Sequence, residues 1–243
     1  MIVPTDKHLQ VGSLLFAGLD QIDLTGPFEV LSRLPNATYQ IYGKTTKPVR
    51  DVRNLKLCAD ATLAEAPALD VLHIPGGYGQ EVVMNDEETL QWVRAQAQSA
   101  GFIFSVCTGA LICGAAGLLQ GKRATTHWSA IHLLSYFGAI PVNERVVMDG
   151  NLVSAAGVTA GIDGALRVAA ALRGEDAAKT IQLYMEYAPE PPFDSGTPAS
   201  APPAVYQAAK QTAHDITEKR TKTAMEWASK HNIPVPLPGA PVS

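Results

Sequence analysis

The chain has 243 residues, of which 47% are hydrophobic and 17% are charged, and its formal net charge is -4 at pH 7. This composition is typical of a globular protein, and the length fits one α/β domain or two small ones. The negative charge offers no basic surface to a phosphate backbone, so we expect no nucleic acid partner. Small molecules or other proteins are the expected partners.

The termini and the cysteines indicate a compartment. The first ten residues carry charged side chains and lack the apolar core of a signal peptide. No apolar stretch reaches the roughly 18 residues of a membrane span. The three cysteines, Cys58, Cys107 and Cys113, suit free thiols in a reducing cell better than a disulfide framework. The sequence therefore predicts a cytoplasmic protein that does not bind membranes.

The first element is a strand within residues 9–16, followed by a loop. Pro27 suits the first turn of a helix that ends at Pro35, because the missing N–H would have no partner there in any case. Asp23 then falls in the loop or at the helix N-cap. Further strands are predicted at residues 39–42 and 55–58.

Two strand–turn–helix units follow. Residues 71–74 form an apolar strand that leads into a glycine turn, and a helix begins at a capping pair, Asn85 and Glu88. Residues 102–104 form the next strand, and the helix after it spans 110–116 with Gly117 as its cap. This alternation predicts an α/β fold with a mostly parallel sheet covered by helices on both faces.

The remaining elements are shorter strands, three helices and a proline-rich segment. Strands are predicted at 124–126, 145–149 and 152–155, the last two forming a hairpin, and helices begin at Thr159 and at Glu175. Residues 188–203 contain six prolines and form an extended strap. A last helix reaches about His231, with an apolar side formed by Val205, Ala209, Thr212 and Ile216. We therefore divide the chain into a domain (1–203), a helix that packs on the domain or on a partner subunit (204–231) and a loose tail (232–243).

The strongest chemical signal is Cys107, which lies between an apolar strand and a helix in Ser105-Val106-Cys107-Thr108-Gly109. This arrangement is similar to a nucleophile elbow, in which a tight turn lifts the side chain above the sheet. The helix N-terminus favours a thiolate, which is the nucleophilic form of cysteine. A buried structural cysteine is the alternative. We interpret Cys58 and Cys113 as small hydrophobic residues.

A second signal is Gly76-Gly77, which follows the neighbouring strand. Paired glycines let the backbone approach a ligand and direct N–H groups at it. Together with the amide of Thr108 they could form an oxyanion-type hole. Most glycine pairs only make turns, so this signal depends on Cys107 nearby.

A nucleophile needs a proton partner, and the candidates at strand ends are Asp23, Glu29, His127 and Asp163. A desolvated Asp23 beside the thiol would have a raised pKa and could donate and accept a proton. Its alternatives are a solvated loop acid and an N-cap. We expect His127 near the sulfur, while Asp163 is explained by its place in the first turn of a helix. The histidines show no ligand spacing, so no metal site is expected.

Four segments together resemble the ThiJ/PfpI superfamily: Asp23-Leu24-Thr25-Gly26-Pro27, Ile74-Pro75-Gly76-Gly77, Ser105 to Gly109, and Ala124-Thr125-Thr126-His127-Trp128. Within it the likeness is to the isonitrile (isocyanide) hydratases. It runs from about Gln10 through the strap into the last helix. The resemblance implies a flavodoxin-like, doubly wound fold, no cofactor and a homodimer.

The resemblance also implies a reaction, the hydration of an isocyanide to an N-substituted formamide. The cysteine that matches Cys107 attacks the terminal carbon, the acid that matches Asp23 supplies the proton, and the matching Thr108 also takes part. Water then releases the formamide. Gly76, Gly77, Tyr78, His127 and Trp128 are the positions expected to bind the substrate or a developing negative charge.

At two positions the sequence differs from most members of the wider superfamily, and these differences limit the activities that the resemblance implies. Many protease-like and amidotransferase members place His directly after the cysteine, whereas this chain has Thr108, although His127 could substitute. Most relatives also use Glu where this chain has Asp23, and the shorter acid fits the hydratase pattern. Some transcription regulators share these segments, but they carry a further helix-turn-helix region, which the residues after Pro203 are too few to form.

Two other functions remain open. Cys107 could sense oxidants or capture electrophiles without turnover, because exposed thiolates also oxidise. A cysteine with a carboxylic acid could also support glyoxalase-like chemistry on small α-oxoaldehydes.

Overall fold

The structure, a computed structural model, describes residues 3–234. A seven-stranded sheet forms its centre, in the order β10-β11-β7-β6-β1-β2-β5. All of its neighbouring strands pair in parallel except β10 with β11. The strands are β1 (Leu9–Leu15), β2 (Ala37–Gly43), β5 (Ala61–Thr62), β6 (Val71–Ile74), β7 (Phe102–Val106), β10 (Val146–Asp149) and β11 (Leu152–Ala155). Two small pairs lie outside the sheet, β3 (Val49–Arg50) with β4 (Lys56–Leu57) and β8 (Arg123–Ala124) with β9 (Ile140–Pro141).

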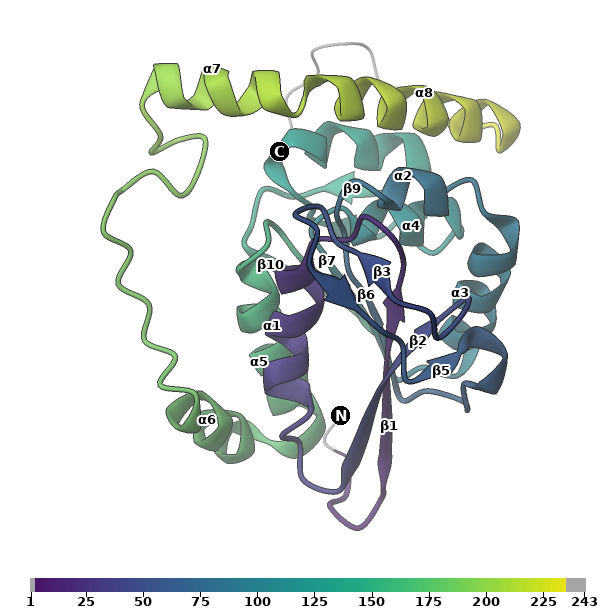
Figure 1. The fold of residues 1–243 in the computed structure, drawn as a ribbon, viewed down its shortest axis with the longest axis vertical. Helices are drawn as coiled ribbons and strands as arrows, with labels where there is room; N and C mark the ends of the chain where they lie inside the picture. The colour runs from purple at the N-terminus through teal and green to yellow at the C-terminus, as the bar shows by residue number, and fades with distance from the viewer. Residues whose placement is uncertain (1–2, 235–243) are drawn as a thin grey trace.

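Helices cover both faces of the sheet (Figure 1). One face carries α1 (Gln21–Leu31) and α5 (Ala160–Arg173), with α6 (Glu175–Tyr184) beside α5. The other face carries α2 (Gln80–Val83), α3 (Glu87–Ser99), α4 (Gly109–Ala115) and the 3-10 helix η2 (Trp128–Phe137); a second short 3-10 helix is η1 (Leu63–Glu65). Two C-terminal helices, α7 (Pro203–Thr212) and α8 (His214–Lys230), lie across one end of the molecule.

The core is split by the sheet into two layers, because successive side chains of a strand point to opposite faces. In β6, Val71 packs with α1 and α5, whereas Leu72 and Ile74 pack with α3, α4 and η2. All four residues of β6 and all five of β7 are buried. Near-continuous apolar strands are therefore central strands of a parallel sheet, as predicted.

The strands β2, β1, β6, β7 and β11 lie side by side in that order, which is the 2-1-3-4-5 order of flavodoxin-like folds. The predicted fold class is confirmed. The direction of the strand order reverses between β1 and β6, and in such sheets ligands bind outside the carboxyl ends of the strands at this point. The segments after β1, β6 and β7 contain Asp23, Gly76 and Cys107.

The first helix begins earlier than predicted. α1 starts at Gln21, with Asp20 as its N-cap accepting the Ile22 N–H at 3.2 Å, so Pro27 lies inside the helix instead of in its first turn. Proline lacks the N–H that would bond four residues back, so the carbonyl of Asp23 receives no helical hydrogen bond from it. Asp23 is therefore neither a loop residue nor the N-cap but part of the first turn of α1.

Other predicted boundaries also change. The helix after the glycine turn is capped by Asp86 and not by Asn85, and Asp86 accepts the Thr89 hydroxyl at 2.6 Å. The strand expected at 55–58 is reduced to the two residues of β4, and Cys58 is exposed, contrary to its interpretation as a small hydrophobic residue. Cys113 is buried in α4, as expected.

The strap leads from α6 at one end of the molecule to α7 at the other (Figure 1). The last helix is then interrupted at Ala213, so α7 and α8 replace the one helix predicted. No α7 residue is buried, and Val205, Ala209 and Thr212 of the predicted apolar side are exposed. Residues 235–243 of the expected tail lie outside the described residues.

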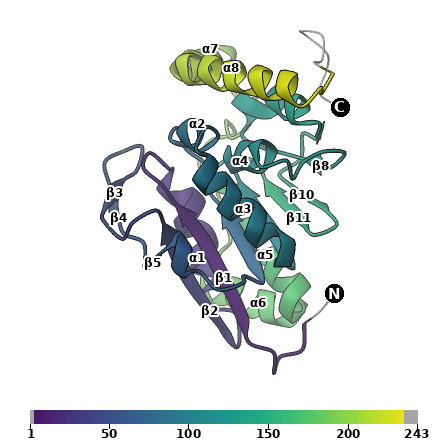
Figure 2. The same cartoon turned by 90° about the vertical axis from the view of Figure 1, so that its right-hand side faces the viewer.

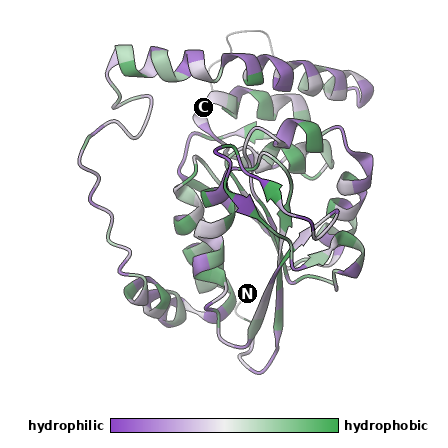
Figure 3. Cartoon of the chain, viewed as in Figure 1, coloured by the Kyte–Doolittle hydropathy of each residue, from purple (hydrophilic) through white to green (hydrophobic). Residues whose placement is uncertain are grey.

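α8 packs against the same chain, across the ends of α2, α4 and η2 (Figure 2). Its buried side is formed by Arg220, Ala224 and Ala228, four residues apart along the helix. The indole N–H of Trp227 donates to the carbonyl of Ala115 at 3.1 Å. α8 is otherwise largely hydrophilic, in contrast to the central strands (Figure 3). Within residues 3–234 no helix is both long and apolar enough to cross a bilayer.

Candidate active site

Cys107 occupies a strained turn between β7 and α4. Its φ angle of 54° lies in the left-handed region that non-glycine residues rarely adopt. Two hydrogen bonds hold the turn: the Cys107 N–H donates to the Ala155 carbonyl at 2.9 Å, and the Thr126 hydroxyl donates to the Cys107 carbonyl at 2.6 Å. This is the geometry of a nucleophile elbow. The side chain is largely buried, with the residue 6% exposed.

Asp23 is fully buried next to Cys107. One carboxyl oxygen, Oδ2, accepts the Gly76 N–H at 3.0 Å. The other, Oδ1, forms no hydrogen bond within residues 3–234. The carboxyl and the thiol lie close enough for each to alter the pKa of the other. Oδ1 is thus the carboxyl oxygen that remains free to take part in a hydrogen bond.

Burial dominates the electrostatics of this pair. It raises the pKa of Asp23 to about 8, and the nearby charge of Asp20 acts in the same direction. Burial also raises the pKa of the Cys107 thiol well above its ordinary value, and the Asp23 charge adds to that. The Thr108 amide and Arg220 lower the pKa of Cys107. The backbone donor expected to favour the thiolate is present, but burial outweighs it.

The N–H groups of the two glycines predicted to form an oxyanion-type hole both donate to side chains of the protein. The Gly76 N–H is donated to Asp23, and the Gly77 N–H is donated to Thr108 Oγ1 at 3.1 Å. A Cβ on Gly76 would lie 2.5 Å from the Thr108 nitrogen and 2.9 Å from Asp23 Oδ2. Gly76 therefore allows the turn after β6 to pack directly against the acid and the elbow.

Above the pair lies a cavity of about 380 Å³. Six of the eight residues proposed from the sequence line it: Gly77, Tyr78, Cys107, Thr108, His127 and Trp128. Asp23 and Gly76 lie behind this lining, in contact with each other. The sequence reasoning missed the rest of the wall, which comes from Asp20, Val52, Arg53, Ser129, Val158, Ala209, Thr212, Ala213 and Arg220.

The other proposed proton partners have different neighbours. His127 lines the cavity, but its Nδ1 contacts the Ser129 hydroxyl at 2.8 Å, and burial followed by the charge of Arg220 lowers its pKa to about 4. Asp163, in the first turn of α5, pairs with Arg145, and Glu29 of α1 pairs with Arg33, two residues beyond the end of that helix. No cluster of three His, Cys, Asp or Glu side chains that could hold a metal is found in residues 3–234.

Arg220 is the cavity residue that sequence reasoning overlooked most clearly. It is 3% exposed, and its guanidinium donates to the Gly77 carbonyl at 2.8 Å and to Thr108 Oγ1 at 3.3 Å. An arginine on a charged helix is usually solvated. The available signal was its place four residues before Ala224 and eight before Ala228, because these two small residues lie on the same side of α8 as Arg220.

The sequence profile of the DJ-1/PfpI family matches residues 10–171, which is more than half of the chain. The chain belongs to the DJ-1/PfpI family. This part of the chain contains every site residue proposed from the sequence, from Asp23 to Trp128. Arg220 and the helices α7 and α8 lie beyond it.

Similar proteins within this DJ-1/PfpI family extend the match toward the C-terminus. The isonitrile hydratase of Pseudomonas putida is 49% identical over 225 residues, which covers 93% of this chain and 99% of that protein. The crystal structure of a ThiJ/PfpI family protein from Pseudomonas syringae superposes with a TM-score of 0.88 at 40% identity, covering 91% of this chain and 93% of that one. Drosophila melanogaster DJ-1beta, at 22% identity and a TM-score of 0.69, shares the fold over 75% of this chain and 100% of its own.

Proposed function

We propose that this protein is an isonitrile hydratase, which converts an isocyanide and water into an N-substituted formamide. The observation that carries the proposal is the buried pair of Cys107 and Asp23 behind the cavity. It is supported by the 49% identity to the Pseudomonas putida isonitrile hydratase along nearly the full length of both chains.

In the first step, the fraction of Asp23 that is ionised near neutral pH accepts the thiol proton through Oδ1 while the Cys107 sulfur attacks the terminal carbon of R–N≡C. The proton then passes from Asp23 to that carbon. The product is a thioimidate, R–N=CH–S–Cys107, and the carboxylate is ready for a second transfer. A raised pKa suits an acid that must hold and release this proton near neutral pH.

In the second step, water adds across the C=N bond: its oxygen binds the carbon and one hydrogen binds the nitrogen. The C–S bond then breaks as the hydroxyl proton returns to sulfur through Asp23. The formamide R–NH–CHO leaves and the thiol is restored. Thr108 supports this step by fixing the turn after β6 through its hydroxyl, which accepts the Gly77 N–H and donates to the Gly77 carbonyl.

The cavity supports a small, largely apolar substrate. Trp128 and Tyr78 contribute aromatic surface, and Trp128 lies 5.4 Å, centroid to centroid, from Tyr206 of α7. No cofactor takes part in this scheme. A peptidase-like reaction through a Cys-His pair is less well supported, because His127 is engaged with Ser129.

Formamide release from cyclohexyl isocyanide, followed through many turnovers per active site, tests the assignment. We expect turnover by the wild type, and at least a 100-fold lower rate for Asp23→Asn, because proton transfer by a positioned side chain contributes about 10²-fold or more. Asp163→Asn is the matched control, since Asp163 lies in the first turn of α5 and outside the cavity.

Methylglyoxal serves as the competing substrate in the same assay. Full activity of Asp23→Asn would show that Asp23 does not transfer the proton in the reaction. A wild type that turns over methylglyoxal but not the isocyanide would favour the glyoxalase-like reaction. A thiol modified once by electrophiles, with no release of product, would favour sensing.

A further inference from the structure

Arg220 brings a positive charge into the interior without a carboxylate partner. Its Nε donates to Gln80 Oε1 at 2.7 Å, and its Nη2 donates to Gly77 and Thr108. All three acceptors are neutral. Within residues 3–234 no Asp or Glu oxygen lies within 4.0 Å of the guanidinium, and Nη1 forms no hydrogen bond. Arginine stays charged in proteins, so the buried cation has donor capacity to spare.

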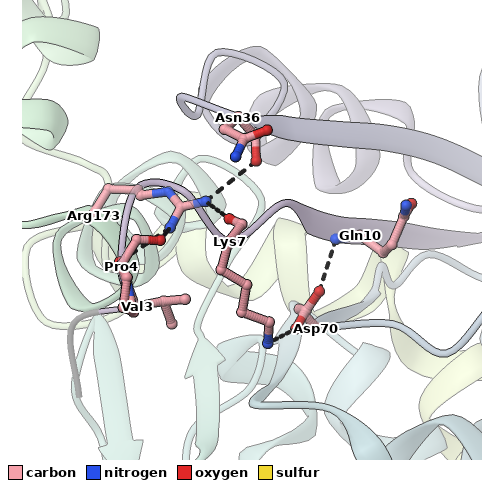
Figure 4. A network of polar contacts seen from close by, with 7 residues as sticks. All are labelled: Val3, Pro4, Lys7, Gln10, Asn36, Asp70 and Arg173. Atoms are coloured by element: carbon pink, nitrogen blue, oxygen red, sulfur yellow. Dashed lines mark hydrogen bonds and ion pairs between the residues drawn. The ribbon is translucent and has the colours of Figure 1, made fainter.

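A second buried arginine shows what a purely structural role looks like. Arg173 of α5 is 7% exposed, and its Nε, Nη1 and Nη2 all donate to backbone carbonyls. The carbonyls belong to Val3, Pro4, Lys7, Pro35 and Asn36, of which Figure 4 draws all but Pro35. Arg173 therefore fastens the N-terminal segment with every nitrogen in use, and it lies outside the cavity. Arg220 differs because it lines the cavity and leaves Nη1 unused.

The charged and titratable groups around Arg220 come from four other elements. Cys107 and Tyr78 line the same cavity as Arg220, and the Tyr78 ring centroid lies 6.0 Å from the guanidinium carbon. Glu81 of α2 is also near, but it accepts the Thr223 hydroxyl at 2.8 Å. His127 at the start of η2 feels the same positive charge. Of these, only the Cys107 sulfur acquires negative charge in the proposed reaction.

We propose that Arg220 is a positioning residue that fastens the Gly77 and Thr108 backbone turns together from α8 and supplies the positive charge that stabilises a negatively charged Cys107 sulfur. A buried anion needs such a partner, because burial otherwise disfavours the charged form. The side chain reaches its contacts across 112 residues of sequence to Thr108 and 143 to Gly77. The site is therefore completed by a helix outside the part that matches the DJ-1/PfpI profile.

This inference rests on the proposed function for the role of sulfur as nucleophile, but its test reads the thiol directly. The rate of Cys107 modification by iodoacetamide is measured from pH 6 to 10 by peptide mass mapping, which separates Cys107 from the exposed Cys58. The proteins are the wild type, Arg220→Gln, Arg220→Lys and the matched control Arg173→Gln. The raised pKa of Cys107 makes the thiolate a minor species over this range, so the rate follows the thiolate fraction. We expect the rate for Arg220→Gln to be about tenfold lower at each pH, since an opposite charge nearby shifts a pKa by roughly 1 to 3 units.

The two further variants distinguish charge from packing. Arg220→Lys keeps the charge, so its modification rate should stay near that of the wild type at each pH. Arg173→Gln should leave the rate unchanged while lowering the melting temperature. An Arg220→Gln profile that coincides with the wild type would overturn the proposal, and so would an equal loss of rate in Arg220→Lys. Failure of the proposed function looks different: the loss of rate in Arg220→Gln would be present, but no formamide would form.

Discussion

At the scale of a single residue, the pKa of Asp23 differs between the folded and the unfolded protein. Asp23 lies in the first turn of α1, and its side chain packs next to the Cys107 turn without any contact with solvent. Burial raises its pKa to about 8, whereas its pKa in the unfolded chain lies near 3.8. The folded protein therefore retains a proton on Asp23 between these values, and the unfolded protein does not.

This difference predicts a pH-dependent cost to stability. Below pH 4 Asp23 is protonated in both the folded and the unfolded protein, so its protonation does not lower the free energy of unfolding. As pH rises from 4 to 8, the contribution of Asp23 to the free energy of unfolding falls by about 1.4 kcal/mol for each pH unit. Asn stays neutral throughout, so Asp23→Asn should gain stability relative to the wild type by several kcal/mol at pH 8.

Urea unfolding of both proteins at pH 5 and at pH 8 measures this effect. We expect the advantage of Asp23→Asn to be larger at pH 8 than at pH 5. An advantage that is equal at the two pH values would show that Asp23 is not held neutral by burial.

At the scale of elements, α8 is the helix on which the site depends. Trp227 anchors it: the indole donates to the Ala115 carbonyl, and its ring lies 5.1 Å from that of Phe137, centroid to centroid. About two turns earlier, the same helix presents Arg220 to the cavity. α7, by contrast, has no buried residue, and only its C-terminal end, with Ala209 and Thr212, contributes to the cavity wall.

Removing this anchor should loosen α8 more than the rest of the protein. We expect Trp227→Ala to cost about 2 to 4 kcal/mol and to speed hydrogen exchange of the α8 amides, because a large ring and a hydrogen bond are lost together. Trp92→Ala is the control, since Trp92 of α3 packs on Tyr42 and not on α8. Equal exchange of α8 in both variants would contradict the anchoring role.

At the scale of the whole molecule, the sequence predicted those strands, turns and hairpins that are determined by residues close together in the chain. The apolar run of β6, the Cys107 turn and the Gly150-Asn151 hairpin follow from residue type and short spacing, and the parallel order then brings the ends of β1, β6 and β7 together. The predicted start of α1 was wrong because both Pro27 and Asp20 are residues that favour the start of a helix. The hydrogen bond from the Ile22 N–H to the Asp20 side chain makes Asp20 the N-cap.

The C-terminal contribution to the site was not predictable in the same way. Arg220 is placed by Gln80, Gly77 and Thr108, each more than a hundred residues away in sequence. The homodimer implied by the family resemblance stays a prediction. Apolar side chains that are partly exposed on α1, Ile22 and Phe28, are available for such a contact.

The central claim is that the Cys107 sulfur carries the hydration of the isocyanide, and one comparison tests it most directly. Formamide release from cyclohexyl isocyanide is measured for the wild type, Cys107→Ala and Cys113→Ala. Cys113 is also buried but lies within α4, outside the cavity. We predict many turnovers for the wild type and Cys113→Ala and none for Cys107→Ala. Turnover by Cys107→Ala at the wild-type rate would contradict the account.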